Sequence, residues 1–237
     1  MSTNPPLGVS VFGAKGRMGS FACRLLRDSA DFELLAAVSS GQDFDEGLHA
    51  GALGLDFTVA GLGFEHGKRM LAGGMRPVIG TSGVTPDEIG ELDRMARELG
   101  LGGRVVPNFS LGAWALEQVG RLLAPRFPQV EIVETHHERK RDAPSGTAKH
   151  LARALEAAGT DKVPIHSLRL PGHYAEHALA FGSTGEFLEL KHSMSGPEAF
   201  GTGILFALEL AATDTGMHVG LPWERLAGPP TKGSVGD

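Results

Sequence analysis

Short apolar runs alternate with helix-length segments up to about residue 109. Apolar runs bounded by glycine or proline are typical of buried strands, and they predict strands at 8–13, 33–38, 55–59, 76–80 and 103–109. Helical spacing predicts helices over 20–29 and 86–100. Residues 8–38 then form a strand–helix–strand unit long enough for a right-handed parallel crossover. The pattern indicates an α/β fold with a parallel sheet.

A different pattern follows residue 110. Apolar residues at helical spacing predict a helix over 111–127, and the next apolar run predicts a strand at 130–137. Three further predicted strands are joined by glycine-rich turns and suit a mixed or antiparallel sheet; they lie at 165–170, 177–181 and 186–192. A final helix is predicted over 200–216.

These elements divide the chain into two expected domains. The first, at 1–109, is α/β, and we expect 198–237 to return to it through the last helix. The second, at 110–197, is a smaller α+β domain. The tail 227–237 has a turn-forming composition and is expected to fray.

Composition and charge narrow the possible partners. The chain has 237 residues and a formal net charge of −6, whereas nucleic-acid binding normally needs a cationic face. Cys23 is the single cysteine, which excludes an intramolecular disulfide. The start MSTNPP lacks the order of a secretory signal, and the best apolar stretch, 203–212, contains Glu209 and is too short for a membrane span. We expect a cytoplasmic protein that contacts neither nucleic acid nor membrane.

The first predicted turn, GAKGRMG, has glycines at 13, 16 and 19 between a strand and a helix. Gly13 would allow a sharp turn, Gly16 a close approach to a pyrophosphate, and Gly19 close packing of the helix on the sheet. Lys15 and Arg17 add positive charge. The turn predicts nucleotide binding; the alternative is a tight turn that binds no ligand.

Ser39 and Ser40 follow the second predicted strand, where a site that prefers NAD usually has an acidic residue. Without a carboxylate at this place, a 2′-phosphate is not repelled, and Lys15 or Arg17 could contact it. We therefore predict that NADPH is used at least as well as NADH. The alternative is that the serines only fill a turn.

The segment ETHHERKRDAPSGTA, residues 134–148, combines acid–base and anion-binding side chains. Ser145, Gly146 and Thr147 offer hydroxyls and backbone N–H groups at a helix start, which can hold a carboxylate, and Lys140 supplies the opposite charge. Unless the strand ends there, His136 and His137 point to opposite faces, so separate roles are expected, one as a proton donor and one as a hydrogen-bonding group.

Two less specific interpretations of this segment remain open, and a third, metal binding, is disfavoured. Paired histidines among charged residues are often surface sequence, and Ser-Gly-Thr before a helix is often only a cap. Glu134 and Glu138 do not form a recognised metal-ligand spacing with the histidines, so we predict no metal. The density of acid–base and anion-binding types favours catalysis on a small dicarboxylate.

The same segment resembles the signature E-x-H-H-x-x-K-x-D-A-P-S-G-T-A of the 4-hydroxy-tetrahydrodipicolinate reductase (dihydrodipicolinate reductase) family. Five further motifs of the family occur in the same order along the chain: GAKGRMG, DFT at 56–58, GTSG at 80–83, PNFS at 107–110 and RLPG at 169–172. The resemblance implies a Rossmann-type domain, a mixed-sheet domain for substrate binding and tetramerisation, and a homotetramer. It implies hydride transfer from NADPH or NADH to a cyclic dicarboxylate on the diaminopimelate route to lysine.

The resemblance also implies roles for single residues. His136 matches the family's proton donor and Lys140 its second acid–base or substrate-polarising residue, while His137, Gly146 and Thr147 match substrate contacts. The positions that match cofactor contacts are Gly13, Ala14, Lys15, Gly16, Arg17, Met18, Gly80, Thr81, Ser82, Val106, Pro107, Asn108 and Phe109. Ser39 lies where many relatives have an acidic residue.

The chain departs from the family pattern at three places. The segment 41–55 is short, which predicts a reduced strand–helix element; Val59 and Ala60 follow DFT where a proline is usual; and Pro197 lies where an arginine is frequent. Two rival functions are a different nicotinamide-dependent dehydrogenase of an amino-dicarboxylate and a non-catalytic nucleotide-binding redox sensor. Neither needs the complete 134–148 segment.

Overall fold

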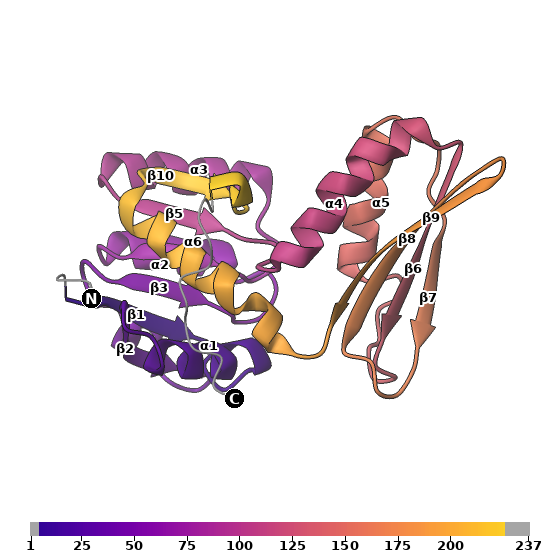
Figure 1. Ribbon diagram of the computed structural model, residues 1–237. Coiled ribbons are helices and arrows are strands. Elements are labelled where there is room, and N and C mark those ends of the chain that lie inside the picture. Colours follow the sequence, from indigo (N-terminus) through magenta and orange to yellow (C-terminus); the bar gives the residue numbers. More distant parts are fainter. Residues whose placement is uncertain (1–4, 226–237) are drawn as a thin grey trace.

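Two β-sheets, each with its own helices, form two lobes (Figure 1). The computed structural model describes residues 5–225, so the predicted fraying of 227–237 lies outside the described residues. One sheet is entirely parallel and the other is mixed. The predicted fold class, a Rossmann-type parallel sheet beside a smaller mixed sheet, is confirmed.

The first lobe is built on six parallel strands in the order β10-β5-β4-β3-β1-β2. They are β1 (Leu7–Phe12), β2 (Phe32–Val38), β3 (Leu53–Asp56), β4 (Arg76–Ile79), β5 (Gly102–Val105) and β10 (Gly216–Val219). Helices α1 (Arg17–Arg27) and α6 (Gly201–Thr213) share one apolar core with the sheet, and α2 (Gly63–Ala72) and α3 (Pro86–Glu98) share another. Burial on both faces explains why the central strands β1, β3 and β4 are short apolar runs without alternation, whereas the edge strand β2 alternates between exposed and partly or fully buried positions.

The second lobe has four strands in the order β7-β6-β8-β9, with β6 and β7 parallel and the other pairs antiparallel. They are β6 (Gln129–His136), β7 (Ile165–Arg169), β8 (Ala175–Ser183) and β9 (Glu186–Met194). Helices α4 (Leu111–Leu123) and α5 (Gly146–Ala157) cover one face of this sheet (Figure 1). The chain passes between the lobes twice, at 106–110 and at 195–200.

After the second passage, α6 packs on the parallel sheet. Ile204 and Leu208 are fully buried in the same core as Val9 and Phe21. Residues from both ends of the described chain therefore build one core, and the second lobe is an insertion between them. No helix among residues 5–225 combines the length and the apolarity that a membrane crossing needs.

The hydrophobic pattern does not predict α2 or β10. Gly67 lowers the helix propensity of α2, yet a Cβ at this position would lie 2.9 Å from the Ile79 side chain, so glycine lets α2 approach the sheet. The predicted helix over 200–216 is wrong at its end, because α6 stops at Thr213 and Gly216, with φ +83°, begins β10. Between β2 and β3 the structure has only a 3-10 turn, η1 (Phe44–Gly47).

Candidate active site

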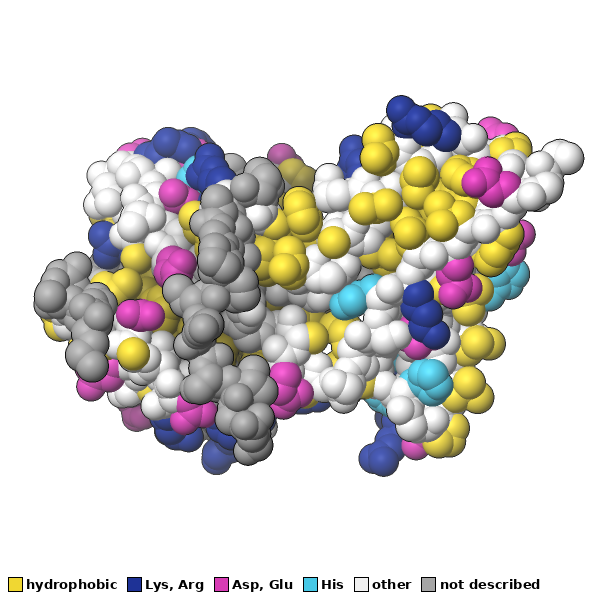
Figure 2. All heavy atoms as spheres, in the orientation of Figure 1, with side chains coloured by type: hydrophobic (Ala, Val, Ile, Leu, Met, Phe, Trp, Pro, Cys, Tyr) yellow, Lys and Arg dark blue, Asp and Glu magenta, His cyan; other side chains and the backbone are white. Residues whose placement is uncertain are grey.

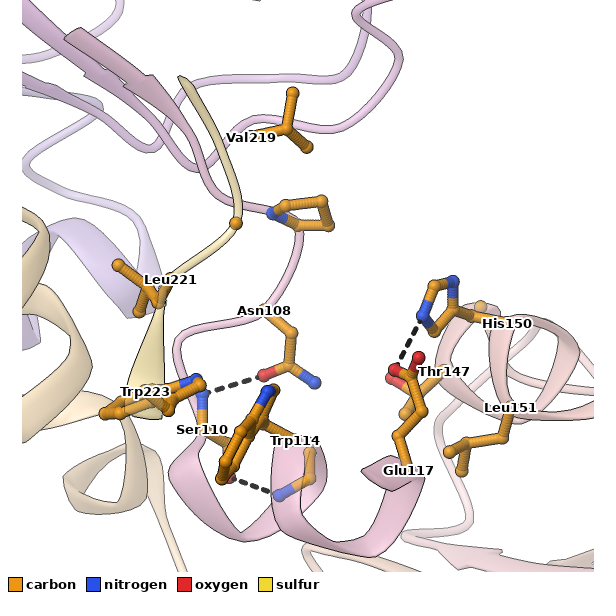
Figure 3. Close-up of a pocket in the computed structure, with 14 residues that line it drawn as sticks. Asn108, Ser110, Trp114, Glu117, Thr147, His150, Leu151, Val219, Leu221 and Trp223 are labelled. Atoms are coloured by element: carbon orange, nitrogen blue, oxygen red, sulfur yellow. Dashed lines mark hydrogen bonds and ion pairs between the residues drawn. The ribbon is translucent and has the colours of Figure 1, made fainter. Parts of the chain in front are cut away.

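Two cavities lie where the lobes meet, beside the segment 106–110. The smaller, about 200 Å³, is lined from the first lobe by Met18, Phe57 and Gly80 and from the second by Thr147, His177 and His192. The larger, about 430 Å³, lies against α4, α5 and the residues after β10 (Figure 3). Both cavities are lined by Pro107, Asn108, Ala113 and Thr147.

The glycine turn after β1 has no space for a side chain at Gly13 or at Gly19. Gly13 has φ +83°, and a Cβ there would lie 2.5 Å from the Phe57 carbonyl oxygen. A Cβ at Gly19 would lie 2.1 Å from the Gly13 carbonyl oxygen, so this glycine sets how closely α1 approaches the turn. Gly16 is the N-cap of α1 and makes no side-chain cap bond. The helix start is thus open to an anion.

The charged residues of this turn are exposed, but they face different surroundings. Lys15 is exposed to solvent, whereas the Arg17 guanidinium lies 5.6 Å from the ring centre of Tyr174, which belongs to the second lobe. Ala14 is buried, with its N–H donating to the Val38 carbonyl, and Met18 lines the smaller cavity. Ser39 is buried next to this contact, and its N–H donates to Gln42 Oε1 at 2.9 Å.

The other predicted cofactor residues lie in the loops after β4 and β5. Gly80 lines the smaller cavity, Thr81 is buried beneath it, and Ser82 is exposed. After β5, Pro107 and Asn108 line both cavities and Phe109 lines the smaller, whereas Val106 is buried in the core. Asn108 Oδ1 accepts from the N–H of Ser110 at 2.9 Å, which fixes the chain where it enters α4 (Figure 3).

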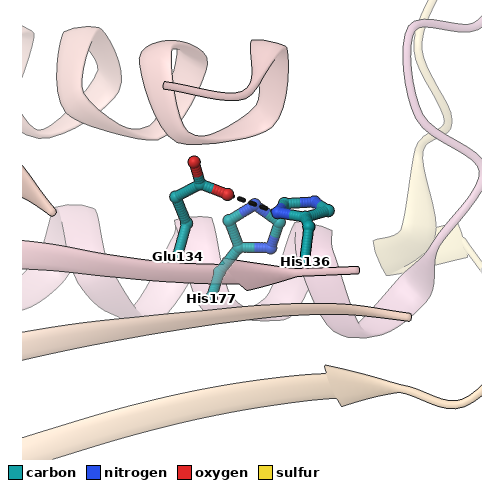
Figure 4. Close-up of side chains that lie close together, drawn as sticks. All are labelled: Glu134, His136 and His177. Carbon is teal, nitrogen blue, oxygen red and sulfur yellow. Dashed lines mark ion pairs between the residues drawn. The ribbon is translucent and has the colours of Figure 1, made fainter. Parts of the chain in front are cut away.

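In the second lobe His136, the last residue of β6, is nearly buried and pairs through Nδ1 with Glu134 Oε2 (Figure 4). The other oxygen, Oε1, accepts from Arg169 Nη2 at 2.8 Å. Burial raises the pKa of Glu134, but the hydrogen bond from Arg169 helps to bring it below its usual value. Burial lowers the pKa of His136 below its usual value, although the nearby Glu134 carboxylate raises it. An ionised carboxylate thus orients a largely neutral imidazole.

Arg169 also holds the loop that follows β6. Its Nε donates to the Lys140 carbonyl at 3.3 Å and its Nη2 to the Asp142 carbonyl at 2.6 Å. The Lys140 ammonium pairs with the Asp142 carboxylate at 2.9 Å, and the Lys140 N–H donates to the His137 carbonyl. Arg169 therefore links the loop after β6 to Glu134.

Three predicted site residues line neither cavity: His136, His137 and Lys140.

Ser145 is buried behind the other predicted anion-binding residues. Its Oγ accepts from the Ala148 N–H at 3.2 Å and lies 3.3 Å from His177 Nε2, and its N–H donates to Glu134 Oε1 at 3.3 Å. Gly146 and Thr147 are instead accessible, and both line the larger cavity. The start of α5 thus offers its backbone to the cavity, while the Ser145 hydroxyl caps the helix.

Two histidines of the site, His177 and His192, escape the sequence reasoning. His177 lies opposite Glu134 in the β6–β8 register, and burial together with the nearby His136 lowers its pKa to about 4. His192 is on β9, and its Nε2 lies 3.5 Å from the Ser110 hydroxyl. Both belong to strands that are distant in sequence from 134–148, so only the strand register could have identified them. Arg169 had no predicted role in the site for the same reason, whereas Glu134 lies inside the segment and enters the sequence interpretation only as a candidate metal ligand.

Glu134, His136 and His177 also place one possible metal-ligand atom each within 4.8 Å of one another (Figure 4). This donor set suits a divalent transition metal. However, the Arg169 guanidinium lies 2.8 Å from the same Glu134 carboxylate. A second cation would have to compete with that charge, so the geometry fits the hydrogen-bonded network better than a metal centre.

Comparisons with known proteins agree along the described chain. The family model described as "Dihydrodipicolinate reductase, N-terminus" matches residues 7–109, and "Dihydrodipicolinate reductase, C-terminus" matches 110–221. The 4-hydroxy-tetrahydrodipicolinate reductase of Lactococcus lactis subsp. cremoris (strain MG1363) is 34% identical over 90% of this chain and 95% of its own. That of Enterococcus faecalis is 34% identical over 90% and 97%.

Solved structures show the same similarity. The dipicolinate-bound dihydrodipicolinate reductase of Paenisporosarcina sp. TG-14 superposes with a TM-score of 0.78 at 27% identity, covering 91% of this chain and 98% of that one. An amine dehydrogenase of Mycobacterium smegmatis superposes with a TM-score of 0.60 at 13% identity, covering 90% of this chain and 94% of that one, and so shares the fold alone.

Proposed function

The chain belongs to the dihydrodipicolinate reductase family, and from that premise we propose that it reduces 4-hydroxy-tetrahydrodipicolinate to tetrahydrodipicolinate with His136 as proton donor. As a member, it is an NAD(P)H-dependent reductase of the diaminopimelate route to lysine. The observation that carries the proposed site is the smaller cavity, which brings the predicted cofactor residues Met18, Gly80 and Phe109 together with Thr147 of the second lobe.

The first lobe fits a dinucleotide at the turn after β1. The absence of space for a Cβ at Gly13 and Gly19, and the open helix start at Gly16, support a pyrophosphate against the backbone. Gly80 and Phe109 would then lie beside the nicotinamide. When bound, the reduced nicotinamide supplies the hydride.

The second lobe would hold the substrate and supply the proton. Gly146 and Thr147 would donate to one carboxylate of the substrate at the start of α5, and Lys140 would add a positive charge and a second acid–base group. The Glu134 carboxylate faces His136 Nδ1, so His136 Nε2 would carry the transferred proton. His137 is proposed as a further substrate contact.

Closure of the lobes would complete this site. His136 is 7% exposed and lies outside both cavities, with its ring centre 5.3 Å from that of His177, which lines the smaller one. Rotation about the two passages, 106–110 and 195–200, would bring the nicotinamide bound to the first lobe toward the substrate beside His136 and Lys140, and would exclude water.

The decisive experiment couples the purified protein to the synthase that produces 4-hydroxy-tetrahydrodipicolinate and follows the absorbance of the reduced nicotinamide. We expect oxidation that depends on the synthase product. Oxidation only with another amino-dicarboxylate would favour a different dehydrogenase. Binding of nicotinamide without turnover of any of these substrates would favour a redox sensor.

NADPH should be used at least as well as NADH. Ser39 provides no carboxylate at the end of β2, and the exposed Lys15 is available to a 2′-phosphate. Measurement of kcat/KM for both cofactors tests this preference. An NADH preference of about tenfold, corresponding to roughly 1.4 kcal/mol, would contradict it.

Association into a homotetramer through the second lobe is also proposed. Leu168, Leu170 and Phe187 are exposed large apolar side chains around its sheet, and Figure 2 shows further hydrophobic side chains over this lobe. Such patches favour protein contacts. Sedimentation velocity on the full chain measures the oligomeric state, and a monomer at micromolar concentration would contradict the proposal.

A further inference from the structure

A fully buried carboxylate, Asp56, ends β3. Its Oδ1 accepts from the Thr58 N–H at 2.8 Å, from the Thr58 hydroxyl at 2.6 Å and from the Thr81 hydroxyl at 3.0 Å. Its Oδ2 lies 3.1 Å from His66 Nδ1. Burial alone raises the pKa of Asp56, but hydrogen bonds from His66 and Thr58 bring it below its usual value. The carboxylate is therefore ionised, and both of its oxygens are used.

The parallel sheet itself does not need a charge at this position. The neighbouring strands β1 and β4 end in Phe12 and Ile79, which are apolar and fully buried at the same edge. Burying a carboxylate is costly unless its hydrogen bonds repay the lost hydration. The role of the Asp56 carboxylate is therefore to hold together the groups that donate hydrogen bonds to it.

Asp56 holds two loops against each other. Thr58 belongs to the loop after β3 and Thr81 to the loop after β4, and the Gly61 N–H also donates to the Ser82 carbonyl at 3.1 Å. Between these contacts lie Phe57 and Gly80, which line the smaller cavity. A Cβ at Gly80 would lie 2.4 Å from the Phe57 ring, so the two loops fit together at one spacing only.

His66 anchors this carboxylate to α2. Its side chain is 13% exposed, and its ring stacks on Phe44 with centres 4.4 Å apart, while Phe44 stacks on Phe12 at 4.1 Å. Phe44 lies in η1, in the short segment between β2 and β3. The Phe12–Phe44–His66 stack therefore packs this segment against β1 and fixes the ring that faces Asp56.

We propose that Asp56 and His66 are positioning residues for the nicotinamide cofactor. Their buried pair holds the loops after β3 and β4 so that Phe57 and Gly80 form the wall of the cofactor cavity. Neither side chain lines this cavity, so each would act through the loop backbone. The inference rests on the proposed function only in taking a nicotinamide dinucleotide as the ligand of this cavity.

The test measures the binding of NADPH to the full-length protein without substrate, by isothermal titration calorimetry. Asp56→Asn and His66→Leu each remove part of the pair, and each should raise the Kd by about tenfold or more, since small misplacements of binding groups are costly. His66→Asn retains a donor near the position of Nδ1 and should bind NADPH within about threefold of the wild type. A purely structural role for His66 would not predict this rescue.

Asp214→Asn is the matched control. Asp214 pairs with the buried Arg104 at 2.5 Å and precedes β10, at the edge of the sheet opposite the cofactor cavity. This variant should lower the Tm but leave the Kd for NADPH unchanged within about twofold. If Asp56→Asn fails to fold, the Kd values of His66→Leu and His66→Asn for NADPH still test the positioning role.

Unchanged NADPH affinity in folded Asp56→Asn or His66→Leu would overturn the positioning role while leaving the proposed function intact. Equal weakening in His66→Asn and His66→Leu would also overturn it, because the retained donor would then have no effect. A wild-type protein that binds neither NADPH nor NADH would overturn the proposed function, and this inference with it.

Discussion

The two lobes prepare their parts of the site in opposite ways. The turn after β1 depends on two positions without side chains, since Gly13 and Gly19 leave no space for a Cβ and present bare backbone. The second lobe works through side chains that hold one another, with Glu134 contacting both His136 and Arg169. Binding by backbone is therefore encoded locally, whereas oriented acid–base groups need partners from several strands.

Removal of the proposed proton donor should have the largest effect and tests whether the two lobes have separate roles. His136→Gln should lower kcat by about 10²–10⁴ because general-acid catalysis is lost, while the Kd for NADPH stays unchanged. Steady-state kinetics and calorimetry measure the two effects. His166→Gln, at an exposed histidine paired with Glu131, is the control and should keep full activity. Equal losses of kcat and cofactor binding in His136→Gln would contradict the division between the lobes.

The glycine turn is tested by adding a side chain where the backbone has no space for one. Gly13→Ala would place a methyl group 2.5 Å from the Phe57 carbonyl at φ +83° and should weaken NADPH binding by about a hundredfold. Gly41→Ala is the control, because Gly41 has φ +87° but open space around it. The Gly41→Ala variant therefore has the backbone strain of a positive φ without a steric clash of the new methyl group. Comparable losses of affinity in both variants would show that strain, and not the close approach, dominates.

A smaller change tests whether the side-chain network orients the catalytic group. Arg169→Lys keeps the charge but loses the planar fork that reaches Glu134 and two loop carbonyls. We expect kcat to fall by about tenfold, as for other residues that orient a functional group. Arg153→Lys, on the exposed side of α5, should leave kcat unchanged. If Arg169→Lys also has the kcat of the wild type, the hydrogen bonds of Arg169 to Glu134 and to the loop have no part in catalysis.

The pH dependence offers the smallest effect. Burial lowers the pKa of His136 below 6.5 despite the opposing effect of Glu134, and Lys140 lowers it further. Since a proton donor acts only while protonated, kcat/KM should fall as the pH rises through an inflection below 6.5. Bound dicarboxylate favours the imidazolium, so the inflection in kcat should lie at a higher pH. An inflection in kcat/KM that lies above 6.5 would contradict a buried donor.

The sequence predicts most of the parallel sheet, because its signals are local. Glycine-bounded apolar runs mark β1 and β4, an apolar run without flanking glycine marks β2, and a strand followed by a glycine turn and a helix marks the possible nucleotide site. The family resemblance is confirmed by the comparisons. Helix α2 escapes prediction because Gly63 and Gly67, which suit its close packing, weaken its local helix signal.

The network of the second lobe escapes prediction for a different reason. Glu134 meets His177 through the antiparallel register of β6 and β8 and meets Arg169 from the end of β7. No local pattern specifies which residue of a distant strand will lie opposite another. The burial of Ser145 is equally non-local, since its hydroxyl caps α5 while its surroundings come from β6 and β8.

One contact sets a condition for exchanging parts between relatives. Arg17 belongs to the glycine turn, but its guanidinium lies over Tyr174 of the other lobe. A chimera that joins the nucleotide lobe of one homologue to the catalytic lobe of another would inherit the arginine from one parent and its aromatic partner from the other. Such a chimera preserves this stacking only if residues 17 and 174 are transferred together as a pair.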